Sequence, residues 1–114
     1  MQNYEAYHLK SNLLFALFGN DYFCNMNVSI IGAGAMGSGI AQVAATAGCK
    51  VVLYDTNRDA LDTAKLKLEK IMHRLIEKKR LTESEAWQII KNHTFTDQLS
   101  EVSESELVIE AIIE

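Results

Sequence analysis

The chain has 114 residues, of which 48% are hydrophobic and 23% are charged, a balance typical of globular proteins. This composition excludes a disordered or collagen-like chain and allows one small domain with a hydrophobic core. Eleven basic and fifteen acidic residues give a formal net charge of -4, so the overall charge gives no reason to expect nucleic-acid binding. The longest apolar run, residues 13–18, is far shorter than the roughly 20 residues of a membrane span.

The two cysteines, Cys24 and Cys49, form neither a metal-binding spacing nor a disulfide framework. We therefore expect two reduced thiols in a cytoplasmic protein without a metal site.

Residues 1–25 differ in character from the rest of the chain. They contain six aromatic side chains without a sustained period, and they end close to the polar group at residues 19–21. Residues 26–31 then form a short apolar run that is typical of a buried strand. We expect residues 26–114 to form the folded domain and residues 1–25 to be an extension outside it.

The next segment predicts a strand–helix–strand unit. Glycine-rich residues 32–37 are followed by small residues at 38–47, which suit a tightly packed helix, and Gly48 is a plausible cap at its end. Residues 50–54 are β-branched and apolar and predict a second strand, with Asp55 at its carboxyl end.

A long helix capped by Asn57 is predicted next, because apolar residues recur at spacings of three and four. These residues are Leu61, Ala64, Leu68, Ile71, Met72 and Leu75.

Thr82 and Glu85 fit a capping box that opens another helix, which extends to about Lys91 and has Trp87 and Ile90 facing inward. Residues 93–96 and 107–113 predict a third and a fourth strand. The order of elements predicts an α/β fold, a Rossmann-type doubly wound parallel sheet with right-handed crossovers.

The glycine motif has the context that dinucleotide binding requires, because it follows a strand, opens a helix and precedes an acid on the next strand. In this pattern Gly32 makes the tight turn, Gly34 lets the backbone approach a pyrophosphate, and Gly37 lets helix and strand pack closely. Backbone N–H groups around Ala35 and Met36 can bind phosphate oxygens.

Asp55 would accept hydrogen bonds from the adenosine ribose and repel a 2′-phosphate, which favours NAD over NADP. Arg58 follows Asp55 by three residues and could pair with a 2′-phosphate, so NADP remains an alternative. FAD-binding chains use a similar motif, and a glycine turn that binds no nucleotide is a further possibility. A methyltransferase would have a looser glycine loop, so Gly37 at the third position argues against that class. The glycines alone define a nucleotide fold and no reaction.

Residues 30–44, with the sequence IIGAGAMGSGIAQVA, resemble the opening of the L-3-hydroxyacyl-CoA dehydrogenases. The chain most resembles the bacterial 3-hydroxybutyryl-CoA dehydrogenase branch of that family. The likeness continues through residues 51–55, 75–82 and 107–114, and so covers nearly everything outside the extension. It implies NAD-dependent interconversion of a 3-hydroxyacyl-CoA and a 3-ketoacyl-CoA.

The resemblance also implies site residues. Those expected to bind NAD are Gly32, Ala33, Gly34, Ala35, Met36, Gly37, Asp55, Ala111, Ile112 and Glu114. Lys78 matches a family lysine that touches CoA, whereas Ile71 stands where the family has a serine. Residues 65–80 carry seven basic and two acidic side chains, which form either a solvated helix face or a ridge for a polyanionic ligand.

The family's catalytic histidine, with its orienting glutamate, matches nothing in this chain and is expected beyond residue 114. His8, His73 and His93 fall elsewhere, so we assign them ordinary surface or helix roles. The resemblance therefore implies a sheet that is incomplete at its C-terminal end and a homodimer formed through a missing C-terminal domain. Alternatives are a non-catalytic NAD-binding module and a λ-crystallin-like sugar-acid dehydrogenase.

Because no histidine here matches the catalytic one, we expect the purified 114-residue chain to have no dehydrogenase activity. NADH formation from 3-hydroxybutyryl-CoA, followed by absorbance, checks this expectation. Rapid turnover by the chain alone would contradict it.

Overall fold

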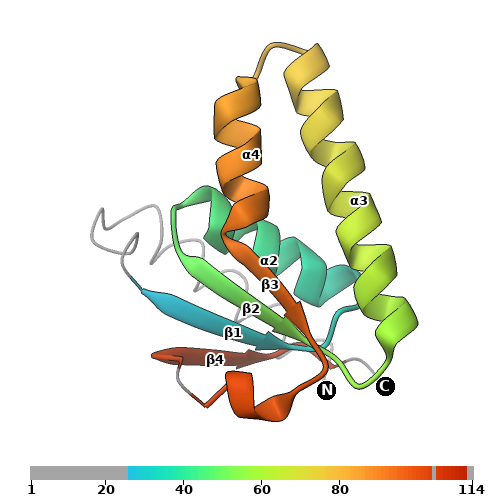
Figure 1. Cartoon of the computed structure of the whole chain (residues 1–114), viewed down its shortest axis with the longest axis vertical. Coiled ribbons are helices and arrows are strands. Elements are labelled where there is room, and N and C mark those ends of the chain that lie inside the picture. Colours follow the sequence, from blue (N-terminus) through green and yellow to red (C-terminus); the bar gives the residue numbers. More distant parts are fainter. Residues whose placement is uncertain (1–25, 104, 113–114) are drawn as a thin grey trace.

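The computed structural model describes residues 26–103 and 105–112 of the chain. In this part four strands form one parallel sheet in the order β3-β2-β1-β4 (Figure 1). The strands are β1 (Asn27–Ile31), β2 (Lys50–Tyr54), β3 (His93–Thr96) and β4 (Leu107–Glu110). Because the strands are parallel, their carboxyl ends meet at one edge, where Ile31 pairs with Tyr54 on one side and Glu110 on the other. The predicted α/β parallel sheet is confirmed.

Helices fill the connections between the strands (Figure 1). They are α2 (Ala35–Thr46), α3 (Arg58–Glu77), α4 (Glu83–Lys91) and the short 3-10 helix η2 (Leu99–Glu101). Helix α2 joins β1 to β2, and α3 and α4 together join β2 to β3. Helices α2 and α3 line one hollow above Leu53 and Phe95, so they cover the same face of the sheet.

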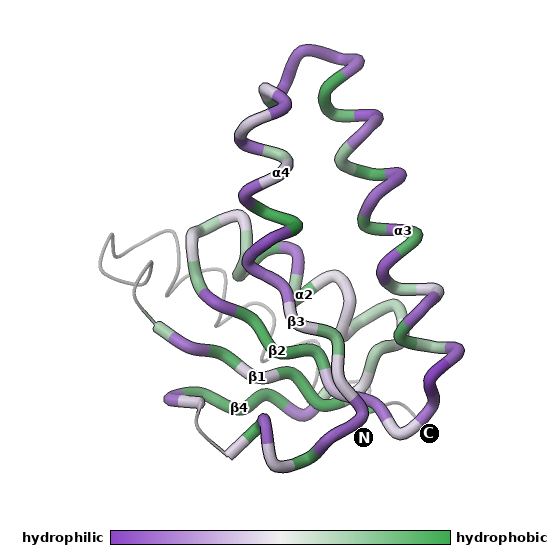
Figure 2. The backbone as a smooth tube through the Cα atoms, in the orientation of Figure 1, coloured by the Kyte–Doolittle hydropathy of each residue, from purple (hydrophilic) through white to green (hydrophobic). Residues whose placement is uncertain are grey.

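The hydrophobic core lies between that face and the helices. Alternate strand residues point into it, as the two-residue period of a strand requires, and Figure 2 shows hydrophobic segments concentrated in the sheet. The helices contribute small residues from α2 and larger aliphatic residues from α3. The main core residues are Val28, Ile30, Val51, Leu53, Ile109, Ile40, Ala41, Ala44, Leu61, Leu68 and Met72.

The predicted helix caps are confirmed. The Asn57 side-chain oxygen accepts hydrogen bonds from the backbone N–H groups of Asp59 and Ala60. Thr82 and Glu85 form a reciprocal capping box, and the hydrogen bonds from Thr82 lower the pKa of the Glu85 carboxyl. Gly48 follows α2 with a φ of +98°, which suits a residue without a side chain.

Two boundaries differ from the prediction. Helix α2 begins at Ala35 rather than at residue 38, because Gly34 is its N-cap and its carbonyl accepts the first helical hydrogen bond, from Ser38. Gly37 therefore lies in the first turn of the helix. Strand β4 ends at Glu110 and does not continue to residue 113, because the chain after Ala111 turns across the end of β1.

The prediction that Trp87 faces inward is wrong. Trp87 is 61% exposed, and the Nζ atom of Lys91 lies 4.7 Å from its ring centroid. Helix α4 instead buries Ala86 and Ile89, with Ile90 half-buried beside them. In a nine-residue helix several phases of the apolar pattern are possible, and packing against α2, α3 and β3 selects one that leaves Trp87 outside.

Gly37 and Gly39 provide a matched test of how closely α2 packs against β1. A Cβ at Gly37 would overlap the Gly32 carbonyl oxygen, whereas a Cβ at Gly39 would meet nothing within 4 Å. We expect Gly37→Ala to lower the free energy of unfolding by at least about 2 kcal/mol. Gly39→Ala should instead raise it by about 0.5–1 kcal/mol, because alanine favours the helix.

Urea unfolding of both variants measures these changes. Equal stability of the two variants would contradict the close contact between Gly37 and the glycine turn.

Candidate functional site

Gly32 makes the sharp turn that follows β1, at a position with no room for a side chain. Its φ is +115°, and an added Cβ would lie 2.9 Å from the carbonyl oxygen of Ala111. Its backbone N–H donates a hydrogen bond to the Tyr54 carbonyl at 2.7 Å. The turn is therefore fixed against the ends of both strands that flank β1.

Gly34 leaves the N-terminus of α2 open. It caps the helix with an extended backbone and no side-chain hydrogen bond, and an added Cβ would meet nothing within 4 Å. Within residues 26–103 and 105–112, no group accepts a hydrogen bond from the backbone N–H groups of Ala35 and Met36. Unpaired N–H groups at the positive end of a helix dipole suit an anion such as a phosphate.

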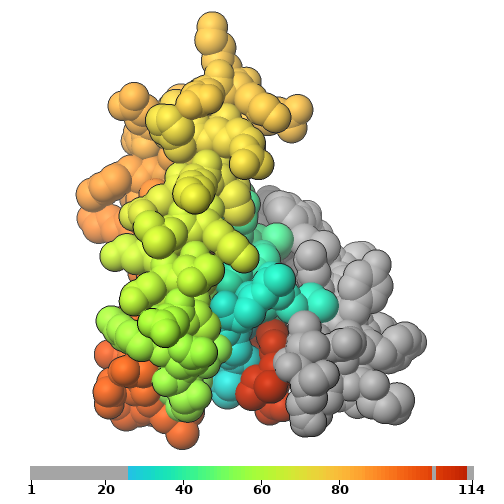
Figure 3. Space-filling view, turned by 90° about the vertical axis from the view of Figure 1, so that its right-hand side faces the viewer, coloured from blue at the N-terminus to red at the C-terminus, as the bar shows by residue number. Residues whose placement is uncertain are grey.

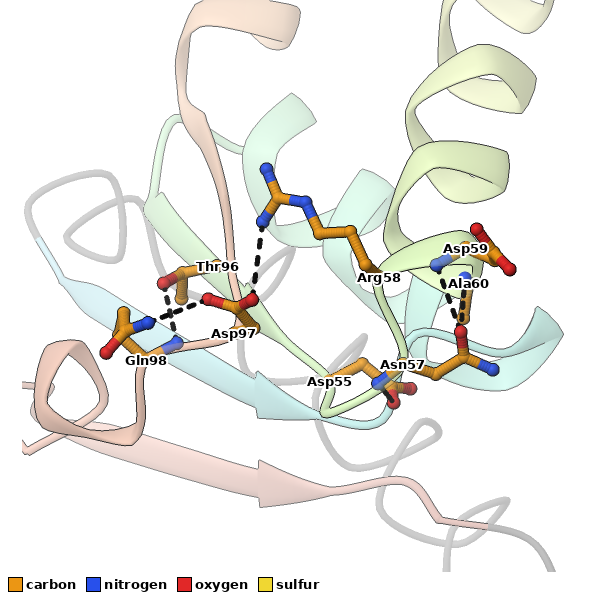
Figure 4. A network of polar contacts seen from close by, with 8 residues as sticks. All are labelled: Asp55, Asn57, Arg58, Asp59, Ala60, Thr96, Asp97 and Gln98. Carbon is orange, nitrogen blue, oxygen red and sulfur yellow. Dashed lines mark hydrogen bonds and ion pairs between the residues drawn. The ribbon is translucent and has the colours of Figure 1, made fainter.

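Asp55 follows β2 and faces the glycine turn. Its Oδ2 atom accepts a hydrogen bond from the Ala33 backbone N–H, and its Oδ1 atom accepts one from the Asn57 backbone N–H, both at 2.8 Å. Figure 4 shows the second of these bonds, together with the Asn57 side chain that caps α3. One carboxylate thus joins the turn after β1 to the segment that begins α3.

These features surround a hollow of about 350 Å³ at the carboxyl edge of the sheet, which we call the edge hollow. Its lining residues are Ile31, Gly32, Gly34, Tyr54, Asp55, Thr56, Asn57, Ala60, Ala111 and Ile112. Five of the predicted cofactor residues therefore meet there. The other five were not predicted to bind a cofactor, and their only signal in the sequence is their closeness to the glycine turn or to Asp55. They are Ile31, Tyr54, Thr56, Asn57 and Ala60.

The segment after β4 closes one side of the edge hollow. The backbone N–H of Ala111 donates to the Ile31 carbonyl at 2.8 Å, and Ala111 is buried, whereas Ile112 is 46% exposed. Glu110 is exposed at the end of β4. Glu114 lies outside the described residues.

A second hollow, of about 440 Å³, lies between α2 and α3, and we call it the interhelical hollow. Apolar residues such as Phe95 and Ile71 line it together with Gln42, Lys67 and His93. Ala33, Gly34 and Ala35 border it as well, so the glycine turn separates the two hollows. Asp59 lines it too, but the carboxylate that is hydrogen bonded to the glycine turn, that of Asp55, lines the edge hollow.

Lys78 stands far from the edge hollow. It is exposed at the C-terminal end of α3, a helix of 20 residues that is about 30 Å long. Figure 3 shows the last turns of α3 rising above the rest of the molecule. The basic residues at positions 70–80 therefore lie on the second half of α3 or just beyond its end, whereas Lys67 lines the interhelical hollow.

His93 is half-buried as the first residue of β3, so the surface role predicted for it is wrong. Its Nδ1 atom is hydrogen bonded to the Ile89 carbonyl at 2.9 Å, and its ring stacks on Phe95. Burial lowers the pKa of His93, and the hydrogen bond to Ile89 opposes this shift. His73 is exposed and its Nε2 atom lies 2.8 Å from a Glu77 carboxylate oxygen, as expected for a surface residue.

A glycine turn, an open helix N-terminus and a carboxylate after β2 at one edge of a parallel sheet define a dinucleotide-binding βαβ unit of the Rossmann class. The family model of the 3-hydroxyacyl-CoA dehydrogenase NAD-binding domain matches residues 27–114. The chain belongs to this family.

Similar proteins support this assignment. A probable 3-hydroxybutyryl-CoA dehydrogenase of Deinococcus radiodurans is 43% identical over 89 residues, which cover 78% of this chain and 32% of that protein. Another, of Bacillus subtilis, is 41% identical over 87 residues, covering 76% and 30%. The crystal structure of (S)-3-hydroxybutyryl-CoA dehydrogenase from Ralstonia eutropha superposes with a TM-score of 0.75 at 32% identity, covering 79% of this chain and 32% of that one. The chain spans about a third of the length of these relatives.

No helix in the described residues combines the length and the apolar character needed to cross a membrane.

His93 predicts a pH dependence of stability. Because its pKa is lowered in the folded protein, the unfolded chain binds a proton more readily below about pH 6.5. The stabilising contribution of neutral His93 is therefore complete above about pH 6.5 and is lost as the pH falls below it. Urea unfolding between pH 7.5 and 5.0 should show this loss, and His93→Gln should reduce it.

His73→Gln is the matched control, since it removes an exposed histidine. A larger reduction of the pH dependence in the control than in His93→Gln would contradict the assignment to His93.

Proposed function

We propose that this chain is the NAD-binding part of an L-3-hydroxyacyl-CoA dehydrogenase of the 3-hydroxybutyryl-CoA dehydrogenase type. The whole enzyme interconverts a 3-hydroxyacyl-CoA and a 3-ketoacyl-CoA. The observation that carries the proposal is the edge hollow, which is lined by both Gly34, the N-cap of α2, and Asp55. The names of the relatives support the choice of substrate.

The edge hollow and the adjoining first turn of α2 together offer the donors and acceptors that a dinucleotide needs. The backbone N–H groups of Ala35 and Met36 would bind the pyrophosphate, and the open space at Gly34 would let it approach. Asp55 would accept hydrogen bonds from the adenosine ribose hydroxyls. Ala111 and Ile112 would lie along the cofactor, and Glu114 would contact it directly.

The bound cofactor supplies hydride acceptance at its nicotinamide ring. The residues of this chain bind and orient it, and a histidine in a segment beyond residue 114 would serve as the general base. Neither His73 nor His93 faces the edge hollow, since His73 pairs with Glu77 on α3 and His93 lines the interhelical hollow.

The acyl-CoA would contact the projecting helix α3. Lys78 offers a cation for the phosphates of CoA, and neighbouring Lys79 and Arg80 raise the local positive potential. Ile71 supplies no hydroxyl, so the CoA contact would depend more heavily on charge than in relatives with a serine there. Assembly into a homodimer through a further domain, and a cytoplasmic location, stay predictions.

The choice of NAD predicts the effect of one substitution. Asp55→Ala removes the acceptor for the ribose hydroxyls and the charge that repels a 2′-phosphate. We expect this variant to bind NAD at least about tenfold more weakly, about 1.4 kcal/mol, and to discriminate less against NADP. Isothermal titration calorimetry with both cofactors measures the two effects.

Equal affinity of the unmodified protein for NAD and NADP would contradict the proposal. Asp62→Ala, on an exposed position of α3, is a control for the loss of one negative charge.

The proposed domain boundary predicts that residues 1–25 are dispensable for cofactor binding. Strand β1 already pairs with both β2 and β4, so no preceding strand is needed to complete its hydrogen bonds. A protein that begins at Met26 should therefore bind NAD as tightly as one that begins at Met1. A loss of tenfold or more, about 1.4 kcal/mol, would show that the extension belongs to the site.

A further inference from the structure

The end of β2 holds the glycine turn through two hydrogen bonds. The Gly32 backbone N–H donates to the Tyr54 carbonyl, and the next backbone N–H, that of Ala33, donates to the Asp55 carboxylate. Ala33 is buried, so without Asp55 its N–H would lack a strong acceptor in a place that water reaches poorly. Two consecutive residues, Tyr54 at the end of β2 and Asp55 after it, therefore fix the turn that precedes α2.

The Asp55 carboxylate has the capacity for a second task. Its two oxygens offer about four acceptor positions, and each oxygen accepts one backbone N–H, from Ala33 and Asn57. One acceptor position on each oxygen is left, which matches the two hydroxyls of a ribose. Holding the turn and binding a nucleotide are thus compatible.

We propose that Asp55 is a positioning residue for the glycine turn, in addition to its role as partner of the ribose. The hydrogen bond from Ala33 to Asp55 fixes the conformation of the turn before any nucleotide binds. Asp55 therefore contributes to nucleotide affinity in part indirectly, because it positions the N–H groups that would bind the pyrophosphate. Its bond to Asn57 ties the same carboxylate to the start of α3 (Figure 4). The ligand-dependent part of this inference rests on the proposed NAD site.

A cofactor analogue separates the two roles of Asp55. An NAD whose adenosine is 2′,3′-dideoxyadenosine has no hydroxyl for Asp55 to bind, yet keeps the pyrophosphate. We expect Asp55→Ala to weaken this analogue by about tenfold, about 1.4 kcal/mol, in calorimetry. Asp59→Ala, which removes a nearby carboxylate without a hydrogen bond to Ala33, should change its affinity less than twofold.

The conservative variant Asp55→Asn tests the mechanism further. Its amide oxygen can still accept the Ala33 N–H, so the variant should bind the analogue more tightly than Asp55→Ala does. An analogue affinity that is equal in the unmodified protein and in Asp55→Ala would overturn the positioning role, even if NAD itself binds well.

Hydrogen exchange tests the same bond without any nucleotide. In the unliganded protein we expect the Ala33 amide to exchange at least tenfold more slowly, relative to its intrinsic rate, than the Ala35 amide, which has no acceptor within residues 26–103 and 105–112. Equal protection of the two amides would overturn the inference. A slow Ala33 amide in a protein that does not bind NAD would support the positioning role and contradict the proposed function instead.

Discussion

The close approach of three backbone segments at the end of β1 determines the rest of the site. Gly32 lies against the carbonyl of Ala111, and Gly37 lies against the carbonyl of Gly32. These contacts place the first turn of α2 at the end of β1, and its N–H groups at Ala35 and Met36 have no acceptor in the described part of the chain. A side chain at either glycine would push α2 or the segment after β4 away, and the helix N-terminus would no longer face Asp55.

The chemistry of the edge hollow comes mostly from the backbone. Peptide N–H groups and one carboxylate are fixed by the sheet, so they need little rearrangement when a ligand binds. This differs from the basic end of α3, where long side chains on a projecting helix carry the charge. The first arrangement favours a ligand by its geometry, and the second favours an anion by its charge.

Much of this arrangement follows from the sequence because local rules and tertiary packing agree. The β-branched run before Asp55, the spacing of the glycines and the caps at Asn57 and Thr82 each specify one conformation. The exposure of Trp87 was not predictable, because a short helix allows several phases and only packing selects among them.

Contacts between residues far apart in the sequence could not be predicted from local patterns either. The bond between Asp55 and Ala33 joins residues 22 positions apart, and the half-burial of His93 depends on how α3 and α4 cover β3. Spacing predicts Asp55 as a ligand for a ribose, but it does not reveal that the same carboxylate accepts a hydrogen bond from the glycine turn. That second role required the folded backbone.

We propose that a dinucleotide binds across the glycine turn at the carboxyl edge of the sheet. Titration of ¹⁵N-labelled protein with NAD, followed by two-dimensional NMR, tests it most directly. The largest amide shifts should fall on Gly34, Ala35, Met36 and Asp55. Shifts confined to Gln42, Thr63 and Lys67 of the interhelical hollow would contradict the account.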